Sequence, residues 1–144
     1  MTDFPQTPAA TAALTVATRF YPPALLNHCV RSYLWGRAYA AAHDVAVDDE
    51  LFYVAAMRDD VSAAVDPESH LQQVATSWDV AGRRPEEFPA AARAEVVARY
   101  PRLGFAQEFL GCFQDQATRK PDGAAAASMA SDGARRIASN PLDG

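Results

Sequence analysis

The sequence predicts an all-α protein that folds as one compact helical bundle. Its 144 residues fall within the usual size of a single hydrophobic core, and 49% of them are apolar, which favours a globular domain over a disordered chain. Helix start and stop signals recur along the chain. Alternation of apolar and polar residues with a period of two never extends beyond a few positions, so we expect no strand.

Prolines predict where the first two helices begin. Pro8 suits the first position of a helix, because its missing N–H has no partner there anyway, and a helix is expected over residues 8–20. The pair Pro22 and Pro23 then forms a junction or a helix start, and nearly six turns follow without a breaker. Gly36 falls inside this second helix, at a place where we expect another helix to come close.

Similar signals predict four more helices. Acidic residues precede an apolar run near Asp48, where they complement the positive end of the helix dipole. Asp66 and Gly82 supply the N-cap and the stop signal of the next helix. The expected ranges are about 48–61, 67–81, 86–99 and 104–119.

The last segment is alanine-rich and weakly amphipathic. We divide the chain into a helical domain over residues 1–122 and a tail over 123–144. Alanine favours a helix in this tail, but Gly133 interrupts it. One last helix and partial disorder therefore both remain open.

Charge and cysteine content exclude several classes of protein. A net charge of -5 disfavours nucleic acid as a partner, because phosphate binding needs clustered Lys and Arg. Cys29 and Cys112 lie in helical segments without zinc-ligand spacing, and we expect free thiols. The sequence has neither a signal-peptide pattern nor an apolar run of membrane-spanning length. A cytoplasmic protein without a membrane partner is therefore expected.

A polar and aromatic stripe follows one face of the second predicted helix. It consists of His28, Arg31, Ser32, Trp35 and Tyr39, which are spaced so that they share that face. Such a stripe can form the wall of a pocket. For the helix taken alone, we favour the other interpretation, a core stripe with a hydrogen-bonded histidine and an arginine whose charge reaches the surface.

Two adjacent acids, Asp59 and Asp60, end the third predicted helix. Acids at a helix C-terminus oppose the helix dipole, which costs about 0.3 to 1 kcal/mol each. Taken alone, the pair can be a solvated helix end or part of a catalytic site.

These motifs together resemble the HD-domain family, in its cyanamide hydratase-like branch. The stretch "PPALLNHCVRSYLWG" is similar to that branch's second helix, which implies that His28 is the first metal ligand. "VAAMRDDVS" is similar to the His-Asp motif and implies that Asp60 is its aspartate. "WDVAG" is similar to the final motif and implies that Asp79 is the last ligand. The resemblance covers most of the chain and implies an all-helical metal-dependent hydrolase or hydratase.

Two departures from the family pattern alter this implication. Asp59 stands where the family has the histidine of its His-Asp pair. Only 18 residues separate Asp60 from Asp79, where the family usually has several dozen that complete the pocket. The resemblance therefore implies a truncated HD-domain-like fold with a degenerate metal site.

Three functions follow as alternatives. The first, which we prefer, is an enzyme of the hydrolase, hydratase or lyase type that needs no cofactor and acts on a small organic metabolite, as in a biosynthetic pathway. Several carboxylates beside one imidazole can carry out elimination, cyclisation or hydration by acid/base chemistry. His28 and Asp60 would be catalytic. The substrate would be held by Arg31, Ser32, Trp35 and Tyr39.

The second alternative is a hydrolase or hydratase that retains one divalent ion. Its acid-rich ligand set of one imidazole and carboxylates suits iron, manganese or magnesium. The ligands would be His28, Asp59, Asp60 and Asp79. The third alternative is a catalytically silent helical module that binds a small molecule or forms a homodimer through the surface that the missing segment exposes.

Overall fold

The computed structural model describes residues 4–58 and 67–143, and within these ranges it contains helices and no strand. The all-α prediction is therefore confirmed. The elements are α1 (Pro8–Phe20), α2 (Pro23–Ala42), α3 (Asp49–Arg58), α4 (Pro67–Ala81), the 3-10 turn η1 (Pro85–Glu87), α5 (Ala90–Arg99), α6 (Phe105–Arg119), α7 (Ala124–Ala130), α8 (Gly133–Ala138) and the 3-10 turn η2 (Pro141–Asp143).

The helix starts agree with the proline and cap signals at α1 and α2. Thr7 caps α1, because its side-chain oxygen accepts a hydrogen bond from the Ala10 N–H at 3.2 Å. Pro8 and Pro23 take the first positions of α1 and α2. The expected N-cap of α4, Asp66, and the expected end of α3 near Val61 lie outside the described residues.

The prediction of a helix over residues 86–99 is wrong at its start. Residues 85–87 form η1, and α5 begins only at Ala90. The reason is Pro89, which disfavours helical geometry in the residue before it. Phe88 accordingly has extended φ and ψ of -122° and 100°. The side chain of Phe88 is thereby turned into the core.

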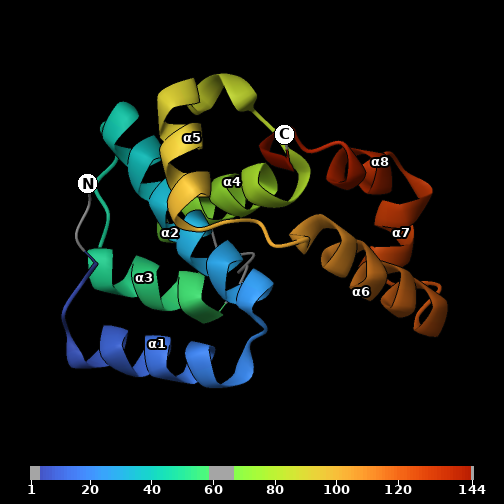
Figure 1. Cartoon of the computed structure of the whole chain (residues 1–144), viewed down its shortest axis with the longest axis horizontal. Helices are drawn as coiled ribbons and strands as arrows, with labels where there is room; N and C mark the ends of the chain where they lie inside the picture. The colour runs from blue at the N-terminus through green and yellow to red at the C-terminus, as the bar shows by residue number, and fades with distance from the viewer. Residues whose placement is uncertain (1–3, 59–66, 144) are drawn as a thin grey trace.

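Helix α2 crosses the middle of the molecule. Figure 1 shows α1 and α3 on one side of it and α6, α7 and α8 on the other, with α4 and α5 packed alongside. The close approach expected at Gly36 is confirmed, since a Cβ built there would lie 2.2 Å from Cζ of Phe52 in α3. The glycine lets the two helices pack at that short distance.

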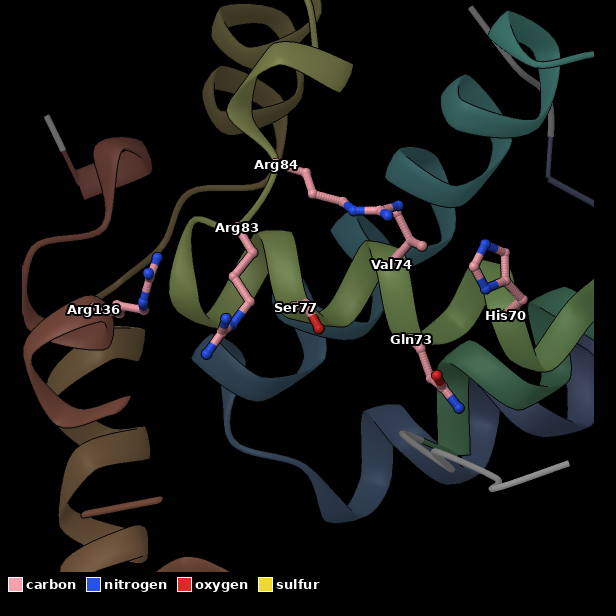
Figure 2. A pocket seen from close by; sticks show the side chains of 7 residues that line it. All are labelled: His70, Gln73, Val74, Ser77, Arg83, Arg84 and Arg136. Atoms are coloured by element: carbon pink, nitrogen blue, oxygen red, sulfur yellow. The ribbon is translucent and has the colours of Figure 1, made fainter. Parts of the chain in front are cut away.

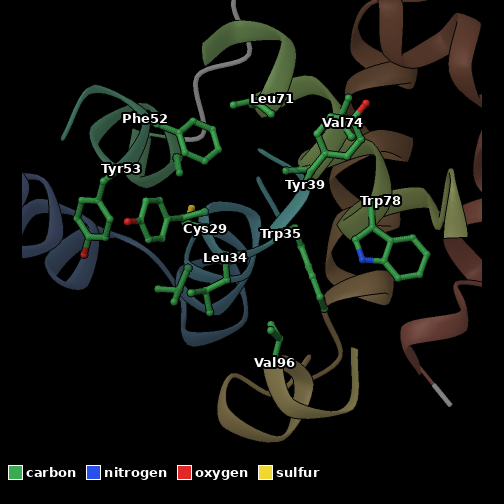
Figure 3. Close-up of a cluster of buried hydrophobic side chains, with 14 of the residues drawn as sticks. Cys29, Leu34, Trp35, Tyr39, Phe52, Tyr53, Leu71, Val74, Trp78 and Val96 are labelled. Atoms are coloured by element: carbon green, nitrogen blue, oxygen red, sulfur yellow. The ribbon is translucent and has the colours of Figure 1, made fainter. Parts of the chain in front are cut away.

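Aromatic side chains fill the core on both sides of α2. Tyr33 packs edge-on against Tyr53, with ring centroids 5.0 Å apart. Farther along, Trp78 stacks on Phe88 at 5.0 Å, and Trp35 meets both of these rings edge-on. Figure 3 shows how α2, α3, α4 and α5 supply this cluster. Each such fully buried ring contributes about 1.5 to 3 kcal/mol to folding.

The tail folds back onto the bundle as two short helices. A single last helix is wrong, because α7 ends at Ala130 and α8 begins at Gly133. A Cβ at Gly133 would lie 2.7 Å from the Ser128 carbonyl oxygen, so this break needs glycine. Ile137 and Leu142 are buried, at 3% and 7% exposure, and anchor the tail.

None of the helices in the two described ranges combines the length and the apolar character that a membrane span requires.

Candidate functional site

Asp79, near the end of α4, is the centre of a buried polar network. Its carboxylate accepts hydrogen bonds from three side chains of α2, all of them 0% exposed. Arg31 donates twice, from Nε to Oδ1 at 2.8 Å and from Nη2 to Oδ2 at 2.9 Å. The Trp35 indole N–H donates to Oδ1 at 2.9 Å, and His28 Nδ1 lies 2.6 Å from Oδ2. These four contacts use all the lone-pair positions of a carboxylate.

The charge of Asp79 is well compensated. Burial raises the pKa of this carboxyl, but the hydrogen bond and charge of His28 and the guanidinium of Arg31 outweigh it and hold the pKa well below its usual range. Arg102 adds a second guanidinium, whose Nη1 lies 3.5 Å from Oδ2. Asp79 is therefore ionised, and because a carboxylate has no proton to give, the His28 Nδ1 atom is the donor of their bond.

Residues from the loop before α6 and from the tail hold the backbone of Asp79. Its carbonyl oxygen accepts hydrogen bonds from Arg102 Nη1 at 2.6 Å and from Asn140 Nδ2 at 2.9 Å. Arg102 is fixed in turn by Asp143, whose Oδ1 accepts from Nε at 2.7 Å. The tail thus completes the network that begins on α2.

The loop before α6 closes the network on its remaining side. Arg31 Nη1 donates to the carbonyl oxygens of Tyr100 and Pro101, both at 3.1 Å. The His28 ring stacks on Phe105, with centroids 4.5 Å apart and planes 10° from parallel. The guanidinium carbons of Arg31 and Arg102 lie 5.7 Å and 5.3 Å from the centre of the same Phe105 ring.

The predicted stripe on α2 divides into two groups. His28, Arg31 and Trp35 all contact Asp79, so the expectation that they share a face is confirmed. Ser32 is 1% exposed, and its hydroxyl has no hydrogen-bond partner in the part of the chain that the structure describes. Tyr39 lies beyond the network, where its ring packs 4.1 Å from the ring of His43.

The candidate metal ligands are only partly described. His28 and Asp79 are in direct contact, whereas Asp59 and Asp60 lie outside the described residues. Among residues 4–58 and 67–143, no group of three or more His, Cys, Asp and Glu side chains is placed to hold one ion. A cation bound to either oxygen of Asp79 would displace an N–H donor and lie beside Arg31. A divalent ion at Asp79 would therefore have to compete with Arg31 for the carboxylate, and the four-residue ligand set that includes Asp59 and Asp60 stays a prediction.

Sequence reasoning missed Arg102, Asn140 and Phe105. All three are buried and contact the network from segments that lie at least 20 positions from Asp79. The stretch "YPRLGF" contains two of them. Its one local signal is Gly104, whose φ of +77° lets the loop turn into α6.

Comparison with known proteins gives no further assignment. No family model matches the chain, and no curated protein matches it either. The resemblance to the HD-domain family therefore stays a prediction, and function has to be argued from the geometry of the site.

Proposed function

We propose that this chain is an HD-domain-like helical module that binds a small molecule and has lost metal-dependent catalysis. In this proposal His28 and Asp79, which the resemblance implies are metal ligands, instead stabilise the core. One observation carries it: the Asp79 carboxylate accepts four hydrogen bonds from buried donors, two of them from a guanidinium. A permanently charged Arg31 in that position competes with a metal ion for the same two oxygens.

Burial supports the same proposal. A catalytic imidazole needs one nitrogen within hydrogen-bond reach of a substrate. His28 is 0% exposed and its ring is stacked flat on Phe105. This packing favours a stabilising role for the imidazole.

Elemental analysis of protein purified without chelator tests the loss of the metal site. We expect far less than one iron, manganese or magnesium ion per chain, and no rise in melting temperature when Mn²⁺ is added. A site that binds only the folded state would raise stability by about 2.7 kcal/mol at a hundredfold excess over the dissociation constant. One tightly held ion per chain, lost in an Asp79→Asn variant that still folds, would overturn the proposal.

A second candidate function is acid/base catalysis by His28, because its Nδ1 atom is 2.6 Å from the Asp79 Oδ2 atom. A carboxylate in this position fixes the tautomer of an imidazole and stabilises its protonated form, as in a general base. Asp60, which lies outside the described residues, is the predicted partner of His28 in this chemistry. The substrate would need a path to the buried ring.

Acylation of histidine by diethyl pyrocarbonate separates the two candidates. His43 and His70 are exposed and serve as internal controls that should react in the native protein. The stabilising role predicts that His28 reacts only after unfolding. Reaction of native His28 at a rate close to that of His43 would favour the catalytic candidate. The predicted homodimer stays a separate prediction, and gel filtration at several concentrations checks it.

A further inference from the structure

A cationic pocket lies along α4, away from the Asp79 network. Its volume is about 410 Å³. Figure 2 shows side chains from α4, from the segment that follows it and from α8 around this space. The lining residues are His70, Gln73, Val74, Ser77, Arg83, Arg84 and Arg136.

Positive charge collects in this pocket although the whole chain carries a net charge of -5. Neither Arg83 nor Arg84 forms an ion pair with a carboxylate of the described residues, and both side chains are exposed. Arg136 donates from Nε to Asp132 at 2.7 Å, and this hydrogen bond lowers the pKa of the Asp132 carboxyl. Asp132 does not line the pocket, and among the described residues that do, three carry a guanidinium group and none a carboxylate. This excess of positive charge in the pocket lining favours an anionic ligand.

The backbone turn after α4 places Arg83 and Arg84 at the pocket wall. Gly82 ends α4 with a φ of +61°, and the Arg83 N–H then donates to the Ser77 carbonyl oxygen at 3.3 Å. Arg84 also has a positive φ, of 58°, which a side chain that is not glycine seldom adopts. In Figure 2 the Arg84 side chain extends across the pocket toward Val74.

A smaller pocket adjoins the cationic one, because Ser77 and Arg83 line both. Its volume is about 190 Å³, and α4, α6 and α8 supply apolar walls that include Val80, Phe109, Phe113 and Ile137. An engineered apolar cavity of about 150 Å³ is large enough to hold benzene. The smaller pocket therefore has room for one ring or a short alkyl chain. Thr76 also lines it, and the buried Thr76 hydroxyl has no partner among the described residues.

We propose that the two pockets together bind a small amphipathic anion, with its carboxylate or phosphate head on Arg83, which lines both pockets, in the positive field of Arg84 and Arg136, and its apolar part between α4, α6 and α8. This inference rests on the proposed role as a small-molecule-binding module, for which it names the ligand class and the place. The guanidinium group of Arg83 supplies paired N–H donors for two oxygens of the head, and Arg84 and Arg136 add positive charge. The apolar walls supply affinity because they bury the apolar chain of the ligand.

Calorimetric titration of the full chain with octanoate, octanol and acetate tests both halves of the ligand. Octanoate is expected to bind at one molecule per chain. Octanol lacks the negative charge of octanoate, and acetate lacks its alkyl chain. Each should therefore bind at least roughly tenfold more weakly than octanoate. Equal affinity for octanoate and octanol, or for octanoate and acetate, would contradict the two-part site. Phenyl phosphate in place of octanoate tells a phosphate head from a carboxylate head.

Variants then place the binding site. The double substitution Arg83→Gln with Arg84→Gln should weaken octanoate binding by roughly tenfold or more, because it removes two of the three guanidinium groups that line the cationic pocket. Arg119→Gln is the matched control, because Arg119 is 69% exposed on α6 and does not line either pocket. Phe113→Ala should weaken octanoate binding and leave the weak acetate binding unchanged. Circular dichroism verifies that each variant is folded.

Two results would overturn the inference: no octanoate binding at millimolar concentration, or binding that the arginine substitutions leave unchanged. Either result leaves the metal analysis unaffected, because neither His28 nor Asp79 lines either pocket. Conversely, a tightly held metal ion would contradict the proposed function while octanoate binding and its loss in the variants could still be observed.

Discussion

Arg31 and Asp79 face each other through two parallel hydrogen bonds, 2.8 Å and 2.9 Å long, although 48 positions separate them in the chain. Both side chains are 0% exposed. The pair therefore joins α2 to α4 at the point where no water can replace either partner.

Arg31→Met should destabilise the protein strongly. It removes two of the four hydrogen bonds of the buried Asp79 carboxylate together with its nearest guanidinium, and breaking a buried pair in this way costs about 3 to 5 kcal/mol. Chemical denaturation followed by circular dichroism measures the change. The control is Arg119→Met, because the Arg119–Asp115 pair is exposed and should contribute no more than about 0.5 kcal/mol. Similar small effects at both positions would contradict the structural role of the network.

Acid should remove the stabilisation that Asp79 supplies. The pKa of Asp79 lies below 3.8 in the folded state and returns to about 3.8 on unfolding. Its contribution is therefore complete above pH 3.8 and is lost as the pH falls from there toward the folded-state pKa. The difference in unfolding free energy between wild type and Asp79→Asn should accordingly be larger at about pH 7 than at about pH 2. A difference that does not change with pH would contradict this account.

Gly36→Ala should destabilise the contact between α2 and α3. Alanine favours an isolated helix by about 1 kcal/mol over glycine, but here its Cβ would meet Phe52 and cost about 1 to 3 kcal/mol in overpacking. Gly111→Ala in α6 is the matched control, since its Cβ would meet no atom within 4 Å, and it should stabilise the chain. Phe52→Leu should relieve the Gly36→Ala defect in a double-mutant cycle. Thermal melts should give a lower melting temperature than wild type for Gly36→Ala and a higher one for Gly111→Ala. Melts of wild type, the two single variants at positions 36 and 52 and their double variant complete the cycle.

Asn140→Ala should weaken the attachment of the tail. It removes the hydrogen bond to the Asp79 carbonyl oxygen and the one that Asn140 Oδ1 accepts from the Leu142 N–H at 2.8 Å. The Asp79 carbonyl oxygen keeps its hydrogen bond from Arg102, but the buried Leu142 N–H is left without its acceptor, which costs about 1 to 3 kcal/mol. Ser139→Ala, one residue earlier and exposed, should change stability by less than about 0.5 kcal/mol. Proteolysis after residue 130 should become faster only in the Asn140 variant.

Much of the fold is predictable because its signals are local. Pro8 and Pro23 sit at helix starts for a reason that lies in the proline ring, and Gly82 ends α4 through its own φ. The alignment of His28, Arg31 and Trp35 follows from helical geometry alone. The position of Asp79 opposite them was expected only through the resemblance to a metal site.

The parts of the site that the sequence does not predict depend on contacts between segments far apart in the chain. Arg102 and Asn140 converge on one carbonyl oxygen from the loop before α6 and from the tail, and nothing in their local sequence indicates a shared partner. The saturation of the Asp79 carboxylate likewise becomes visible only when α2 and α4 are packed together. A motif predicts which side chains meet, but the number of donors that reach each oxygen depends on the packed structure.

The contacts of Asn140 and Asp143 have a consequence for the order of events during protein synthesis. Asp79 and its partners on α2 are made early, but the hydrogen bonds of Asn140 to the Asp79 backbone and of Asp143 to Arg102 must wait until residues 140–143 leave the ribosome. Until then, the polar centre of the bundle lacks two of its contacts, and the nascent chain should remain sensitive to protease. A chain stalled before residue 140 should therefore expose this centre, and one stalled far enough beyond residue 143 for residues 140–143 to leave the exit tunnel should protect it.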